Sequence, residues 1–198
     1  MMKSLNFILL ILFITFQSFA GIPPAGRATG FFLGVGVGPR IPVSEFAQKS
    51  NIGYGINAEI SYTDNSFLPV FLFLNTGYEQ YPGSQSYFKE NEYSNININS
   101  VPVNAGIRYY FPPIIESIFL LMPMVQASAN YTHTNTLYEF DESLNKKSII
   151  ENKNEFGFSA GIGVSAFMME LLTSYNYLPE KQFISVDLKV RFPLYINF

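Results

Sequence analysis

Several residue types are missing or scarce in this 198-residue chain, and each shortage excludes a class of structure. There is no cysteine, which excludes a disulfide framework and a lipidated N-terminal cysteine. Charged residues make up only 14% of the chain, whereas a soluble domain usually has about 25%. The net charge of −3 leaves no basic footprint, so nucleic acid is not an expected partner.

Catalytic signals are also scarce. The single histidine, His133, lies five residues from Ser128, and odd spacing along a strand places two side chains on opposite faces. They therefore form no dyad, and His133 is interpreted as a solvated residue at a loop edge rather than a general base. No cluster of His, Asp and Glu has metal-ligand spacing, so we expect no catalytic residue, no metal and no other cofactor. A lipid-modifying enzyme is kept as an alternative.

Residues 1–20 have the layout of a secretory signal peptide. Lys3 precedes an apolar run over residues 7–16, and small residues at Ser18 and Ala20 suit cleavage before Gly21. The run is shorter than the roughly 20 apolar residues that a membrane-spanning helix needs. We therefore expect a cleaved signal peptide at 1–20 and one domain at 21–198.

The remaining apolar residues are plentiful but dispersed, at 48% hydrophobic and 17% aromatic in the whole chain. The last segment shows the pattern clearly, because large apolar residues occupy every second position from Val186 to Phe198. This period of two indicates a β-strand with one apolar and one polar face. Pro193 cannot donate to a strand ladder, so a bulge or a weak hydrogen bond is expected there.

The same alternation recurs and predicts eight strands, at about 30–39, 52–63, 67–80, 98–111, 118–132, 155–167, 170–178 and 182–198. The connections at 40–51, 81–97 and 133–154 are long and polar, whereas most of the others are short turns. Short turns at one end and long loops at the other are typical of an outer-membrane barrel. The fold class predicted is therefore all-β: an eight-stranded, antiparallel, up-and-down transmembrane β-barrel preceded by a signal peptide.

A soluble ligand-binding barrel in the periplasm is the alternative, with the apolar face turned inward. Against it, the other face is rich in Gly, Ser and Asn, which would make a poor core. Aromatic residues near the strand ends also suit the girdles at a membrane interface. These are Tyr62, Tyr109, Phe111, Tyr131, Tyr175 and Tyr177.

An eight-stranded barrel has an interior that side chains can fill, so no open pore is expected. Charges inside it must be paired, because desolvation costs several kcal/mol per ion. The glycines of the first strand, Gly34, Gly36 and Gly38, are expected to leave room for Lys189 and Arg191. The predicted interior charge cluster consists of Glu59, Arg108, Glu170, Asp187, Lys189 and Arg191.

Three segments resemble the outer-membrane protein β-barrel domain family, which includes small OmpA/OmpX-like barrels: GVGVGPRIPVSEF at 34–46, GYGIN at 53–57 and SVPVNAGIRYYF at 100–111. The resemblance implies a location in the bacterial outer membrane, contact with its lipids, and insertion by the barrel assembly machinery. It implies that Leu194, Ile196 and Phe198 form the assembly signal. It brings no common catalytic residues. A structural role, or binding of an external ligand through loops 81–97 and 133–154, is therefore expected.

Overall fold

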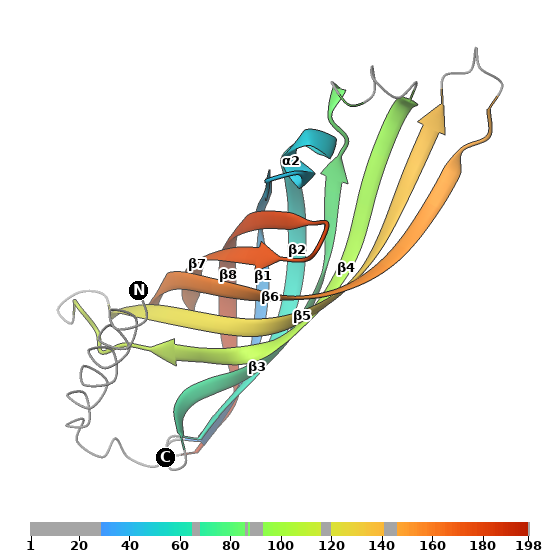
Figure 1. Ribbon diagram of the computed structural model, residues 1–198. Helices are drawn as coiled ribbons and strands as arrows, with labels where there is room; N and C mark the ends of the chain where they lie inside the picture. Colours follow the sequence, from blue (N-terminus) through green and yellow to red (C-terminus); the bar gives the residue numbers. More distant parts are fainter. Residues whose placement is uncertain are drawn as a thin grey trace, which may run out of the picture.

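The computed structural model describes residues 29–64, 68–85, 87, 93–115, 120–140 and 146–197. Their backbone forms eight antiparallel strands, and β8 pairs with β1 to close a barrel (Figure 1). The predicted fold class is confirmed for these residues, whereas the signal peptide at 1–20 lies outside them. The elements are β1 (Thr29–Val43), α2 (Phe46–Lys49), β2 (Gly53–Asp64), β3 (Leu68–Pro82), β4 (Tyr93–Tyr110), β5 (Leu121–Phe140), β6 (Ile149–Ala166), β7 (Met169–Tyr177) and β8 (Gln182–Asn197).

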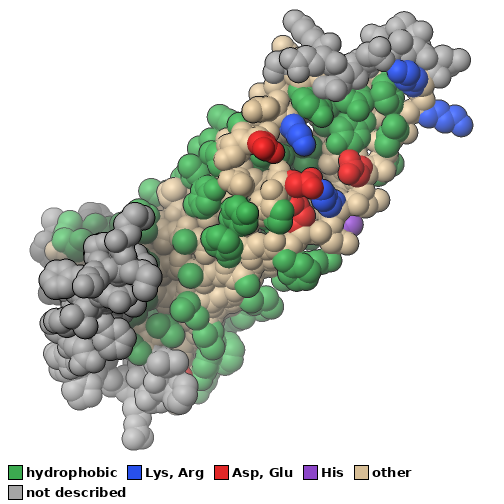
Figure 2. Space-filling model, in the orientation of Figure 1, with side chains coloured by type: hydrophobic (Ala, Val, Ile, Leu, Met, Phe, Trp, Pro, Cys, Tyr) green, Lys and Arg blue, Asp and Glu red, His purple; other side chains and the backbone are tan. Residues whose placement is uncertain are grey.

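The apolar face of each strand points out of the barrel and the polar face points in. Along β2, Ile56 and Ile60 are more than half exposed, whereas Glu59 between them is 1% exposed. Figure 2 shows hydrophobic side chains spread over the barrel wall, while charged side chains gather at one end. This arrangement is the reverse of a soluble barrel, in which apolar residues fill the interior. Among the described residues, no helix is long and apolar enough to cross a membrane.

Aromatic side chains mark the two ends of this apolar wall. At the end where β1 begins and β8 finishes, called the terminal end here, Phe31 packs on Tyr62 with ring centroids 4.8 Å apart. At the opposite end, called the hairpin end, Tyr131 packs on Phe156 at 4.9 Å. The pairs face outward, as the predicted girdles require.

The prediction of long loops is wrong for most of 133–154 and for both ends of 81–97. β4 already begins at Tyr93, β5 continues to Phe140, and β6 begins at Ile149. These three strands project beyond the others at the hairpin end, where α2 also lies (Figure 1). In β4 the alternation of hydrophobicity reverses there, because Ile96 and Ile98 are buried on the inward face while Asn97 faces outward, whereas β5 carries polar residues on both faces. Strand pairing continues through this part of the sheet, with Leu137 opposite Ile150 and Asn97.

Candidate functional site: the filled barrel interior

Arg108 is the centre of an ionic cluster near the terminal end of the interior. Its guanidinium donates two hydrogen bonds of 2.8 Å to the carboxylate of Glu59, and it lies 3.2 Å from Glu170. Lys189 reaches the same Glu59 at 2.7 Å, and Arg191 lies between Glu59 and Glu170 at 3.4 and 3.1 Å. Arg108 has no exposed surface. These five residues form the terminal cluster, and five of the six predicted cluster residues meet in it.

The strand register brings these side chains together. Glu59 on β2, Arg108 on β4, Glu170 on β7 and Lys189 on β8 all lie at inward positions of their strands. Each strand contributes one or two charges, so no neighbouring pair of strands contains the cluster. Closure of the barrel is therefore needed before the charges can neutralise one another, as buried ions require.

Asp187, the sixth predicted residue, belongs to a second cluster nearer the hairpin end. Arg40 joins it to Glu79, with contacts of 3.0 Å to Asp187 and 2.9 Å to Glu79. Lys181 donates to Glu79 at 2.9 Å and to Ser100 at 2.8 Å. Arg40, Glu79, Lys181 and Asp187 are defined as the hairpin cluster.

The prediction of a single cluster that included Asp187 was therefore wrong, and it missed Arg40 and Lys181. Both residues fell in segments interpreted as loops, although β1 extends to Val43 and carries Arg40 into the interior. Lys181 lies in the turn between β7 and β8, and its side chain folds back over Tyr81, 4.6 Å from the ring centroid. Burial lowers the pKa of the Lys181 ammonium, and the Glu79 carboxylate opposes that shift.

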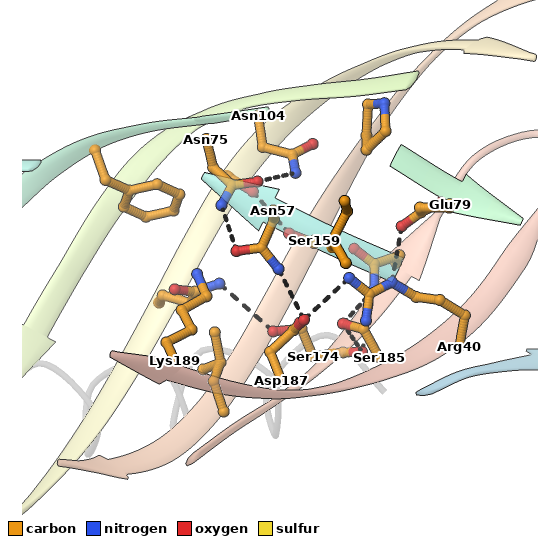
Figure 3. Close-up of a pocket in the computed structure, with 17 residues that line it drawn as sticks. Arg40, Asn57, Asn75, Glu79, Asn104, Ser159, Ser174, Ser185, Asp187 and Lys189 are labelled. Carbon is orange, nitrogen blue, oxygen red and sulfur yellow. Dashed lines mark hydrogen bonds and ion pairs between the residues drawn. The ribbon is translucent and has the colours of Figure 1, made fainter. Parts of the chain in front are cut away.

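A polar layer lies between the two clusters and contacts the hairpin cluster through Asn57 (Figure 3). Asn57 donates to Asp187 at 2.9 Å and accepts a bond from Asn75 at 3.1 Å. The layer encloses a cavity of about 40 Å³, and the side-chain oxygen of Asn104 is buried beside it without a protein partner. A polar cavity of this size holds one or a few water molecules, far fewer than a water-filled channel would need.

Aromatic side chains cover the interior at both ends. At the hairpin end, Phe46 of α2 packs edge-on against the fully buried Tyr81, with ring centroids 5.0 Å apart. At the terminal end, Arg191 lies 5.3 Å from the ring centroids of both Phe71 and Tyr110. The inward Phe71 of β3 therefore covers a largely buried cation.

The glycines of β1 were predicted to leave room for the Lys189 and Arg191 side chains of β8, and only Gly36 does so. A Cβ atom at Gly36 would lie 2.6 Å from the Cγ atom of Lys189 and 2.9 Å from the side-chain oxygen of Asn57. At Gly34 the nearest atom would be 3.5 Å away and belongs to Glu59, so this glycine makes no room for Arg191. At Gly38 the close neighbour would be the backbone of Val186.

The comparison with known families assigns this architecture. Residues 7–192 match the family described as outer membrane protein beta-barrel domain. The chain belongs to this family. It is therefore an outer-membrane β-barrel protein, and its location is the bacterial outer membrane.

Similar solved structures include three bacterial barrels. Neisserial surface protein A (NspA) is 13% identical with a TM-score of 0.50, over 83% of this chain and 97% of that one. Ail of Yersinia pestis is 11% identical with a TM-score of 0.49, over 85% and 100%. The N-terminal barrel of Pseudomonas aeruginosa OprF is 16% identical with a TM-score of 0.44, over 85% and 100%. The likeness to NspA shows the fold alone. The sequence matches none of the curated proteins with which it was compared.

The last strand of this outer-membrane barrel carries the expected bulge at Pro193. Phe32 pairs with Pro193 and Phe31 pairs with Tyr195, so Leu194 is the extra residue. The bulge ends the alternation predicted through Phe198, because Tyr195 shares the outward face with Phe31. Ile196 consequently lies opposite Gly30, on the inward face. Phe198 lies outside the described residues, and the role of Leu194, Ile196 and Phe198 in assembly stays a prediction.

His133 lies within β5 rather than at its end. Its side chain points outward, and its Nδ1 atom lies 2.7 Å from the side-chain oxygen of Asn154. Ser128 points into the barrel and bonds Ser159 at 2.7 Å, so the two residues are on opposite faces as predicted. In the part of the chain that the structure describes, no three His, Asp or Glu side chains are placed to hold a metal ion.

Proposed function

We propose that this protein is a non-enzymatic barrel without an open pore, and that it presents the projecting part of β4, β5 and β6 to the cell exterior as a binding surface. The observation that carries the proposal is the filled interior. Among the described residues, two ionic clusters, a polar layer and aromatic side chains at both ends fill the interior, and the polar layer encloses a cavity of about 40 Å³. Such a barrel can anchor a sheet in the membrane but has no path for solutes.

The mouth of the barrel is the part best suited to an external ligand. A cavity of about 80 Å³ lies between α2, the inward face of the projecting sheet and the β7–β8 turn. Tyr138 and Glu151 line it on the sheet, and the Lys153–Glu180 ion pair joins the sheet to the turn. Aromatic, acidic and basic groups on a rigid scaffold can bind a polar ligand.

The enzyme alternative has little support from the geometry. His133 is bonded to an amide, and the nearest serine in sequence faces the opposite side of the wall. A general base needs a partner that orients it towards a substrate, and Asn154 is not an acid. The family and the outward apolar wall exclude the soluble periplasmic alternative.

The proposed orientation can be tested with single cysteines, because the chain has none of its own. Asn152→Cys places a thiol on the projecting part of β6, and Phe167→Cys places one in the β6–β7 turn at the terminal end. Both native side chains are exposed. A bulky charged maleimide should label N152C on intact cells, and F167C only after the outer membrane is permeabilised. The reverse pattern would contradict the proposal.

The same preparation tests the predicted processing. The N-terminus of the purified protein should begin at Gly21 if residues 1–20 are a cleaved signal peptide. An N-terminal sequence that still contains Lys3 would show that the segment is retained.

A further inference from the structure

The outward face of the barrel changes character sharply where the sheet begins to project. Up to Tyr131 on β5 and Val101 on β4, the outward residues are apolar or aromatic. Beyond that line most outward positions carry amides or an imidazole. We define these residues as the amide belt: Gln80, Asn95, Asn97, Asn99, His133, Asn135, Asn152 and Asn154.

Hydrogen bonds organise the amide belt across the strands. Asn135 donates to Asn152 at 2.8 Å, and Gln80 donates to Asn97 at 3.2 Å. Each primary amide has two N–H donors and an acceptor with two lone pairs, so one bond leaves further capacity free. Asn152 and Asn154 are exposed, so solvent or a ligand can reach their side chains.

Two outward tyrosines donate hydrogen bonds to residues of the amide belt. The hydroxyl of Tyr78 donates to Asn99 at 2.7 Å, and the hydroxyl of Tyr54 donates to Gln80. Tyrosines on the outward face of a membrane barrel lie at the level where hydrocarbon meets headgroup. Outward positions two residues further along a strand are about 7 Å further along it, and positions four residues further are about 14 Å, before the strand tilt reduces the height. Asn99, His133 and Asn154 are two residues beyond the apolar wall and therefore lie in the headgroup layer. Asn97, Asn135 and Asn152 are four residues beyond it, at the height of sugars that extend above that layer.

The charge of the belt distinguishes between kinds of headgroup. Among the described residues of the projecting β4–β6 sheet, the outward face has no lysine or arginine, and Glu139 supplies its one carboxylate. Recognition of phosphate relies on arginine or lysine, which this face lacks. Amides instead match hydroxyl groups, which both donate and accept. Asparagine is also disfavoured in strands, so the sequence keeps these amides against a local structural preference.

We propose that the amide belt binds the neutral sugar headgroups of membrane glycolipids that surround the barrel. The headgroups that bind to the belt belong to the same lipids whose acyl chains cover the adjoining apolar wall. This binding uses the outward face of the sheet and is independent of the ligand cavity at the barrel mouth.

A triple variant, N97T/N135T/N152T, tests the proposal. Threonine favours strands, so the sheet is retained while three amides are lost. The probes are phosphatidylcholine vesicles and phosphatidylcholine vesicles that contain a digalactosyl diacylglycerol. We expect the native barrel to unfold in urea about fivefold more slowly with the glycolipid, because a ligand that binds only the folded state stabilises it. The triple variant should show the same rate in both vesicles.

L137T is the matched control, since Leu137 lies on the same outward face between the amides but carries none. It should keep the response to glycolipid. Equal unfolding rates of the native protein in the two vesicles would overturn the proposal. So would an undiminished response in the triple variant. Free digalactose that protects the barrel equally in plain phosphatidylcholine would also overturn it, because the ligand would then be a soluble saccharide.

Discussion

Arg108 and Glu59 lie on β4 and β2, strands separated by β3, and meet in two hydrogen bonds of 2.8 Å inside the barrel. The paired geometry is the one in which a guanidinium holds a carboxylate most firmly. Phe73 of the intervening strand lies over the same guanidinium, 5.0 Å from its ring centroid. Arg108 thus connects β2, β3 and β4 through a single side chain, which also lies 3.2 Å from Glu170 of β7.

Replacing Arg108 by methionine should destabilise the barrel strongly. The change keeps apolar volume but removes the paired hydrogen bonds to Glu59, and leaves Glu59 and Glu170 with Lys189, Arg191 and the hydroxyl of Tyr110 as partners. We expect a loss of about 3 kcal/mol in the free energy of unfolding, measured by urea denaturation in vesicles. K147M is the control, since Lys147 is exposed and lies between β5 and β6. A variant R108M as stable as K147M would contradict the role given to the terminal cluster.

The glycines of β1 provide a test of interior packing with two variants of the same chemistry. Gly36→Ala places a Cβ atom 2.6 Å from Lys189 and should cost about 1–3 kcal/mol through overpacking. Gly34→Ala meets its nearest neighbour at 3.5 Å and should be nearly neutral. The comparison uses the urea midpoints of the two variants. Equal midpoints would show that the interior has more room than the structure indicates.

Substitution of two glutamates at the hairpin end allows a buried ion pair to be compared with an exposed one. Glu79→Gln removes the carboxylate shared by Arg40 and Lys181, both buried, and should cost about 3 kcal/mol. Glu180→Gln breaks the pair with Lys153, in which both side chains are well exposed, and should change stability by less than about 1 kcal/mol. Thermal unfolding monitored by gel mobility would measure both. A larger effect of E180Q would contradict the assignment of the hairpin cluster.

Much of the fold could be predicted because alternation directly encodes which face of a strand meets lipid. Ile56 and Glu59 point as their positions predict, and so do Ser128 and His133. The terminal cluster could be predicted from the same alternation of inward and outward positions. Charged residues at inward positions of a narrow barrel must meet.

The parts of the structure that could not be predicted depend on features other than the two-residue alternation of hydrophobicity. β5 continues beyond Thr132 because backbone pairing with β4 and β6 does not require apolar side chains, so the sequence pattern stops before the strand does. Arg40 and Lys181 were missed because they enter the interior from a strand end and a turn. The bulge at Leu194 was expected from Pro193, but its effect on Ile196 follows only from the register with β1.

The sealed interior is the central claim, and conductance across a planar lipid bilayer tests it most directly. Purified full-length barrel should insert without stepwise current, because the described interior is filled by ionic clusters around a cavity of about 40 Å³. The heat-modifiable gel shift of the same sample would show that the inserted protein is folded. Regular stepwise openings from that folded sample would contradict the account and show that ions pass between the charges.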